Sequence, residues 1–123
     1  MSRKPTILIG EDKQFLVDII KESFGSGFNC ICVRTEEKVF ENLDSADAVV
    51  VGLDVCPREQ EERVKMISEI KARKDIPLMA LTSLQYSSVR IELLRQGADD
   101  VMTKPFNPEE LVIRMEKLLS RIR

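Results

Sequence analysis

Five polar residues follow directly on short apolar runs, where their side chains are placed for chemistry. Glu11 and Asp12 follow one run, Asp54 follows another, and Thr82 and Lys104 lie at the ends of two later runs. Carboxylates are hard oxygen ligands that suit Mg²⁺ or Ca²⁺, and a carboxylate can act as the nucleophile of an aspartyl-phosphate scheme. A lysine can meet a phosphoryl oxygen as a point charge. Together these residue types indicate metal-assisted chemistry on a phosphoryl group.

Each of these residues also has a purely structural interpretation. An acid after a strand often caps the next helix, a threonine there often belongs to a turn, and a single lysine is usually a solvated charge. Their conjunction at four strand ends favours the functional interpretation. The chain has no histidine, which excludes Ser-His-Asp catalysis, Cys-His catalysis and histidine-bound zinc within this chain.

The elements that must position these residues alternate between two patterns. Short apolar runs predict five strands, at residues 7–9, 28–33, 48–53, 77–81 and 101–102. Amphipathic stretches predict five helices, at residues 13–24, 35–43, 57–73, 84–96 and 107–122. Such alternation predicts a parallel sheet with helices on both faces. Ligands of such sheets bind beyond the carboxyl ends of the strands, where the five polar residues fall.

Several helix ends and helix faces carry recognisable signals. Thr35 and Asn107 are predicted N-caps, Pro108 suits a first turn, and Glu110 completes a pattern like a capping box. Gly97 is expected to end the fourth helix. The stripes expected to face the core are Phe15, Leu16, Ile19, Ile20 and Phe24 in the first helix, and Leu111, Val112, Met115, Leu118, Leu119 and Ile122 in the last.

The composition is that of one soluble domain. The chain has 123 residues, of which 43% are hydrophobic and 33% charged, enough for one core. The number of cysteines is odd, and Cys30 and Cys32 lie only two apart, so we expect buried free thiols in a reducing compartment. A net charge of −2 gives no basic footprint for nucleic acid, and no apolar stretch has the length of a membrane span. We therefore expect a cytoplasmic protein that binds neither nucleic acid nor membrane directly.

Four segments resemble a known family, the receiver domain of two-component response regulators. They are ILIGED, AVVVGLD, PLMALTS and, most specifically, GADDVMTKPFNPEEL. The resemblance covers essentially the whole chain and implies one receiver domain over residues 1–123. It also implies the α/β flavodoxin-like (βα)5 fold, a three-layer sandwich whose parallel five-stranded sheet has the order 2-1-3-4-5.

The resemblance assigns a role to each of the five polar residues. Glu11 and Asp12 match the acidic pair that holds a weakly bound Mg²⁺, to which Asp54 also contributes. Asp54 matches the phospho-acceptor, Thr82 the hydroxyl residue that follows the phosphoryl group, and Lys104 the lysine that pairs with it. The resemblance further implies a cis bond between Lys104 and Pro105. The Asp54 chemistry is self-phosphorylation and self-dephosphorylation at most, so the domain is not expected to be an enzyme.

The chain also departs from the family pattern. Glu11 stands where aspartate is commoner, Pro57 lies three residues after Asp54 where the family usually has four, and Val101 replaces a common aromatic residue. The segment REQEERV lacks the usual Asp-Gly of its loop. These departures keep open a second interpretation, a pseudo-receiver that binds proteins without phosphorylation. A flavin or nucleotide enzyme is disfavoured, because Gly10 stands alone where a glycine-rich phosphate loop is needed.

The receiver interpretation also implies partners. The phosphoryl donor would be a histidine kinase or a phosphotransfer protein, which supplies the histidine that this chain lacks. The recipient of the signal would be an output domain or a separate partner protein. A homodimer through the face from Leu84 to Ile122 is a further expectation.

Overall fold

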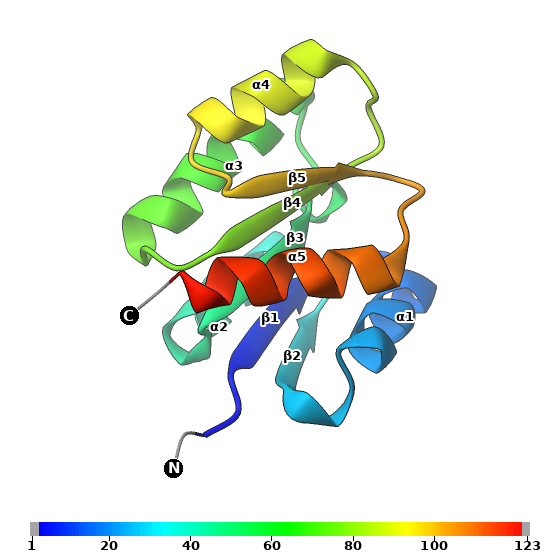
Figure 1. The fold of residues 1–123 in the computed structure, drawn as a ribbon. Coiled ribbons are helices and arrows are strands. Elements are labelled where there is room, and N and C mark those ends of the chain that lie inside the picture. Colours follow the sequence, from blue (N-terminus) through cyan, green and yellow to red (C-terminus); the bar gives the residue numbers. More distant parts are fainter. Residues whose placement is uncertain (1–2, 122–123) are drawn as a thin grey trace.

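The five apolar runs form one parallel sheet in the computed structural model, which describes residues 3–121 (Figure 1). The strand order is β2-β1-β3-β4-β5, so the predicted (βα)5 fold and its 2-1-3-4-5 order are confirmed. β1, β3 and β4 are buried along their whole lengths, as their apolar sequences require. The strands are β1 (Thr6–Gly10), β2 (Asn29–Val33), β3 (Ala48–Gly52), β4 (Leu78–Thr82) and β5 (Asp100–Thr103).

Within residues 3–121, four α-helices and three short 3-10 turns lie between these strands, and a fifth α-helix follows β5. The α-helices are α1 (Gln14–Phe24), α2 (Glu36–Asn42), α3 (Gln60–Arg73), α4 (Ser87–Arg95) and α5 (Pro108–Ser120). The 3-10 turns are η1 (Gly25–Gly27), η2 (Leu43–Ser45) and η3 (Leu53–Val55). α3 and α4 each begin three residues later than predicted. The intervening residues 57–59 and 84–86 stay in loops at the edge where the polar residues lie.

The helices form two layers, one on each face of the sheet (Figure 1). On one face, buried residues of α1 and α5 pack against Ile7, Ile9 and Val50. On the other, buried residues of α2, α3 and α4 pack against Leu8 and Val49. Successive residues of a strand therefore point into opposite cores. This fixes the register of each strand and the position of the loop at its end.

Two expectations about burial are wrong. Phe15 and Ile19 in α1 are 61% and 41% exposed, because the core-facing side of this helix is the row formed by Val17, Ile20 and Phe24. The thiols of residues 3–121 are all free, but Cys32 is exposed, because β2 is an edge strand with little cover from helices.

The last helix follows its predicted pattern closely. Leu111, Met115 and Leu118 are buried, whereas Val112 and Leu119 are half-buried at the border of the core. Ile122 lies outside the described residues.

Most predicted caps are confirmed. The Thr35 side chain accepts a hydrogen bond from the Lys38 amide, and Asn107 accepts one from the Glu109 amide directly before Pro108 begins α5. Glu110 does not complete a capping box, since its carboxylate binds Arg114 at 2.7 Å instead. Gly97 follows α4 with φ of 118°, a conformation that glycine adopts without strain.

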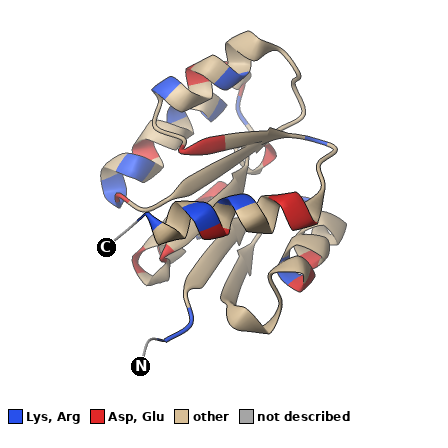
Figure 2. Ribbon diagram, viewed as in Figure 1, with Lys and Arg blue, Asp and Glu red and all other residues tan. Residues whose placement is uncertain are grey.

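Charged residues of both signs are interspersed on the helices, most visibly along α5 (Figure 2). The interior strands β1 and β3 carry no charged residue. Within the part of the chain that the structure describes, no helix is long and apolar enough to cross a membrane.

Candidate functional site

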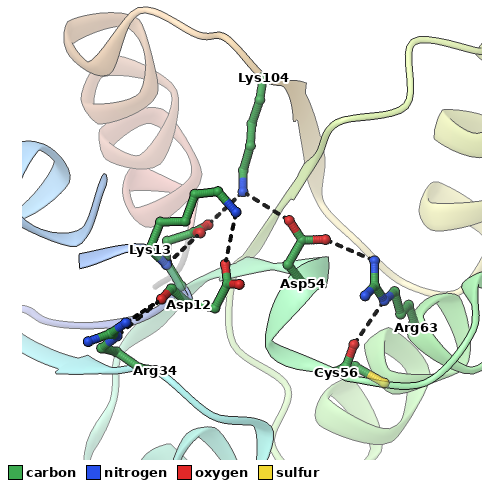
Figure 3. A network of polar contacts seen from close by, with 8 residues as sticks. Asp12, Lys13, Arg34, Asp54, Cys56, Arg63 and Lys104 are labelled. Carbon is green, nitrogen blue, oxygen red and sulfur yellow. Dashed lines mark hydrogen bonds and ion pairs between the residues drawn. The ribbon is translucent and has the colours of Figure 1, made fainter. Parts of the chain in front are cut away.

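The carboxyl ends of the strands bring the predicted polar residues to one edge of the sheet. Glu11 and Asp12 follow β1, Asp54 lies in the η3 turn after β3, and Lys104 follows β5. Thr82 is the last residue of β4. The Lys104 side chain reaches back to Asp54 (Figure 3). It also reaches Glu11, so these three groups meet as the topology predicts.

Lys104 links the two acidic side chains. Its Nζ lies 2.9 Å from Glu11 Oε1 and 3.7 Å from Asp54 Oδ2. Its side chain is only 13% exposed, and its backbone amide donates to the Thr82 carbonyl at 2.8 Å. The predicted cis bond between Lys104 and Pro105 is present. The Lys104 backbone is held by the hydrogen bond to Thr82, and its ammonium group points into the carboxylate cluster.

Glu11 is fully buried, although it carries the longer acidic side chain at this position. Its carboxylate lies directly over Gly52, and a Cβ atom at residue 52 would overlap Glu11 Oε1 and lie 3.2 Å from the carboxyl carbon. Gly52 therefore makes the room that the extra methylene of Glu11 needs. Burial raises the pKa of Glu11 above its ordinary 4.5, and the neighbouring Asp12 carboxyl adds to this, while Lys104 acts against it.

Asp12 occupies a more open position. Lys13 Nζ lies 3.9 Å from its Oδ1, and its backbone carbonyl accepts two hydrogen bonds from Arg34, at 2.8 and 3.1 Å. Partial burial acts to raise the pKa of Asp12, but contact with the Glu11 carboxyl and the charges of Lys13 and Lys104 outweigh it and lower the pKa. Asp12 thus stays ionised beside the more easily protonated Glu11.

The two oxygens of Asp54 face two different cations. Oδ2 faces Lys104, and Oδ1 accepts a hydrogen bond from Arg63 Nη1 at 2.8 Å (Figure 3). Arg63 Nε also donates to the carbonyl of Cys56 at 2.8 Å. The Asp54 side chain is 28% exposed, so an incoming group can reach it. A carboxylate in this setting can serve as a nucleophile whose added charge is offset by neighbouring cations.

Arg63 was not predicted as a site residue. It is the fourth residue of α3, in a first turn whose neighbours Glu61 and Glu62 suit the positive end of a helix dipole. An arginine at a helix N-terminus is unfavourable unless it has an acidic partner, and this is the signal in the sequence that could have found it.

Thr82 lies at the same edge but is differently engaged. It is buried, and its Oγ1 accepts a hydrogen bond from the Leu84 amide at 3.1 Å. Within residues 3–121 no hydrogen bond joins its hydroxyl to Asp54 or Lys104. The loop after Thr82 leads to Tyr86, 68% exposed at the start of α4. Val101, on the neighbouring β5, packs against the core of α2, α3 and α4.

The donor set fits a weakly held divalent cation. No group of three or more acidic, cysteine or histidine side chains within residues 3–121 is close enough to hold a metal unaided. Mg²⁺, however, usually takes one or two carboxylates and completes its shell with water and phosphate oxygens. Glu11 Oε1 and Asp12 Oδ1 are buried, and each faces an ammonium group, Lys104 Nζ at 2.9 Å and Lys13 Nζ at 3.9 Å, whose place beside the carboxylates a divalent cation could share.

Comparison with known proteins agrees with this geometry. Residues 7–116 match the family model described as "Response regulator receiver domain". Over 118 residues the chain is 35% identical to the response regulator SaeR of Staphylococcus aureus strain USA300, which covers 95% of this chain and 51% of SaeR. The chain thus spans about half the length of the curated relatives it matches.

Solved structures share the fold. The BeF3-activated receiver domain of DrrB superposes with a TM-score of 0.86 at 23% identity, covering 97% of this chain and 100% of that one. A two-component response regulator from Clostridium difficile superposes with a TM-score of 0.87 at 18% identity, covering 98% and 99%. The structural likeness supports the fold, and the family model with the SaeR similarity supports the family. The chain belongs to the response regulator receiver domains.

Proposed function

We propose that this receiver domain accepts a phosphoryl group on Asp54 from the phosphohistidine of a partner kinase or phosphotransfer protein. An Asp54 carboxylate oxygen forms a bond to phosphorus as the phosphorus–nitrogen bond of the donor breaks. The donor imidazole leaves with the electron pair and takes up a proton. The observation that carries the proposal is the position of Lys104, whose side chain is only 13% exposed and whose Nζ lies 3.7 Å from Asp54 Oδ2.

The surrounding residues each contribute to this transfer. Lys104 offsets the negative charge that the phosphoryl oxygens bring to Asp54. Asp12, Glu11 and Asp54 would hold Mg²⁺, which when bound supplies positive charge to the phosphoryl oxygens. The Thr82 hydroxyl accepts a hydrogen bond from the Leu84 amide, and turned toward Asp54 it would donate its own hydrogen to a phosphoryl oxygen. That rotation would alter the loop before α4 and so transmit the signal.

The experiment is phosphorylation of the domain by acetyl phosphate in the presence of Mg²⁺, followed by intact mass spectrometry. We expect one phosphoryl group on the wild type and none on Asp54→Asn. Asp44→Asn is the matched control, since Asp44 is an exposed acid away from the site, and it should be labelled like the wild type. Equal labelling of wild type and Asp54→Asn would refute Asp54 as the acceptor.

A second candidate function is protein binding without phosphorylation. The pairing of Asp54 with Arg63 favours it, because a carboxylate held by arginine is less available for reaction. The same mass measurement separates the two, since a folded domain that takes up no phosphoryl group would support the second function.

The proposal extends to partners and location. We place the domain in the cytoplasm, without direct nucleic-acid contact, and propose that its chemistry is confined to its own Asp54. An output domain or a partner protein would receive the signal. A homodimer through the face from Leu84 to Ile122 is supported by Ile91, Leu94 and Ile113, which are large, apolar and exposed on α4 and α5. Light scattering with and without acetyl phosphate tests it, and a monomer in both conditions would contradict it.

A further inference from the structure

Arg63 forms a bridge between two oxygen atoms beside the proposed phosphorylation site (Figure 3). Nη1 donates to Asp54 Oδ1 and Nε donates to the Cys56 carbonyl, both at 2.8 Å. A carboxylate oxygen and a backbone carbonyl oxygen are both hard donors of the kind that divalent cations take from proteins. The guanidinium thus already donates hydrogen bonds to two oxygen atoms beside the η3 turn.

The position of this guanidinium is set by more than one contact. Two of its nitrogens are engaged by acceptors on two different residues, and its side chain is about one quarter exposed. The neighbouring Arg58 is bound elsewhere, with its guanidinium on the Glu36 carboxylate at 2.9 and 3.0 Å. The two arginines of this region therefore have separate partners, and only Arg63 is directed at the acceptor.

The Arg63 bridge also affects how strongly the site attracts a cation. Glu11, Asp12 and Asp54 supply negative charge, and Lys104 lies between the first and last of these. Arg63 weakens the attraction of the site for a further cation, because its guanidinium lies 2.8 Å from Asp54 Oδ1. A divalent cation that binds Asp54 Oδ1 must displace the guanidinium from it, whereas Oδ2 faces Lys104 at 3.7 Å.

We propose that Arg63 competes with Mg²⁺ for Asp54 Oδ1 and the Cys56 carbonyl, and so sets the metal affinity of the site. The proposal rests on the function proposed above and deepens it. With no cation bound, Arg63 holds the acceptor. Binding of Mg²⁺ requires the Arg63–Asp54 pair to open, and the free energy of that pair is subtracted from the free energy of metal binding.

The test is calorimetric titration of the whole chain with MgCl2, comparing the wild type with Arg63→Met. Methionine keeps an unbranched apolar stem but is shorter than arginine and has neither the charge nor the donors. We expect the Kd for Mg²⁺ to fall about three- to tenfold, because a partly exposed, solvent-screened pair contributes less than a buried one. Lys65→Met is the matched control, because it removes one positive charge from the exposed side of the same helix. Its Kd should stay within about twofold of the wild type.

Arg63→Lys provides a second, independent variant. Lysine keeps the charge but donates from a single nitrogen, so it cannot reproduce the two-pronged bridge. We expect its Kd to fall in the same direction as that of Arg63→Met, but by less. Thermal unfolding of each variant verifies that it is folded before titration.

An unchanged or higher Kd in Arg63→Met would overturn the proposal, as would an equal fall in Lys65→Met. Measurable binding in Arg63→Met together with none in the wild type would support it. The phosphorylation assay tests the proposed function independently of the titration. If the wild type is labelled on Asp54 but the Kd values are equal, only the role of Arg63 is wrong. If nothing is labelled, the proposed function is wrong, and the titration still decides the competition.

Discussion

Gly52 lies directly beneath the carboxylate of Glu11, so closely that any side chain at residue 52 would overlap it. Gly52 ends β3 and Glu11 directly follows β1, so the contact joins two segments that are far apart in the sequence. The longer acid at residue 11 is accommodated because the neighbouring strand ends in glycine. The Lys104 ion pair with Glu11 depends on this fit.

Gly52→Ala should therefore destabilise the fold and displace Glu11. We expect a loss of about 1–3 kcal/mol in the free energy of unfolding, as for overpacking of a core. Urea denaturation measures it. Gly27→Ala is the control, because no atom lies within 4 Å of an added Cβ there, and it should change stability by no more than about 0.5 kcal/mol. Glu11→Asp, whose side chain is shorter, should partly rescue Gly52→Ala, and strictly additive effects would contradict the steric explanation.

Glu11 should also make the stability of the domain depend on pH. Its folded-state pKa is raised from 4.5 by burial, so its contribution to stability is full below pH 4.5 and is lost as the pH rises through the folded pKa. Glu11→Gln should consequently gain stability relative to the wild type between pH 4.5 and 7. Denaturation in the presence of EDTA at pH 4.5 and at pH 7 measures this gain. Glu116→Gln, at an exposed position, is the control. A difference that shrinks with rising pH would show that burial does not dominate at Glu11.

The pKa of Asp12 is shifted in the opposite direction, so its effect on stability has the opposite pH dependence. Its folded-state pKa is lowered from 3.8, so its contribution is present above pH 3.8 and is lost as the pH falls through the folded pKa. Asp12→Asn should therefore be less destabilised, relative to the wild type, at pH 2.5 than at pH 5. Asp44→Asn, at an exposed acid, serves as the reference in the same denaturation series. A constant difference across this range would be inconsistent with the lowered pKa.

Mg²⁺ should stabilise the domain through the carboxylate cluster. At a concentration about ten times its Kd, a ligand of the folded state raises Tm by about 3–6 °C in a chain of this size. We expect this shift in the wild type, its reversal by EDTA, and its loss in Asp12→Asn, all by scanning calorimetry. Asp44→Asn should keep the full shift. An undiminished shift in Asp12→Asn would place the cation elsewhere.

Thr82 has a structural role that can be measured before any phosphorylation. Its hydroxyl is the acceptor for the Leu84 amide, so Thr82→Val leaves that amide without this partner. We expect a loss of about 1–2 kcal/mol in unfolding free energy, whereas Thr82→Ser keeps the hydroxyl and should lose less. Hydrogen exchange at Leu84 should accelerate in the valine variant. Unchanged exchange would mean that the bond contributes nothing to the loop.

The cluster of Glu11, Asp54 and Lys104 could be predicted because parallel strands deliver the residues after them to one edge. That argument needs only the order of apolar runs and polar residues along the chain. It does not reach Arg63, whose contact with Asp54 depends on where α3 begins. The sequence places that start at Pro57, and the structure places it at Gln60. A shift of three residues turns a helix by most of one revolution, so no contact of its side chains could be derived.

The fit of Gly52 against Glu11 and the exposure of Cys32 were missed for related reasons. Both depend on the side-chain environment in the assembled sheet, not on local pattern. A strand with apolar residues can lie at an edge, as β2 does, and its thiol then faces solvent. The mispredicted faces of Phe15 and Ile19 follow from the same limitation, since periodicity defines a stripe but not which side of it meets the core.

Tyr86, the residue directly before α4, also gives the molecule an intrinsic fluorescent probe. The chain has one tyrosine and no tryptophan, so all intrinsic ultraviolet emission at tyrosine wavelengths comes from Tyr86. Tyr86 lies four residues after Thr82, on the segment whose hydrogen bonding Thr82 controls. Emission and anisotropy of the unlabelled protein therefore report on this one segment, with no dye or engineered fluorophore needed.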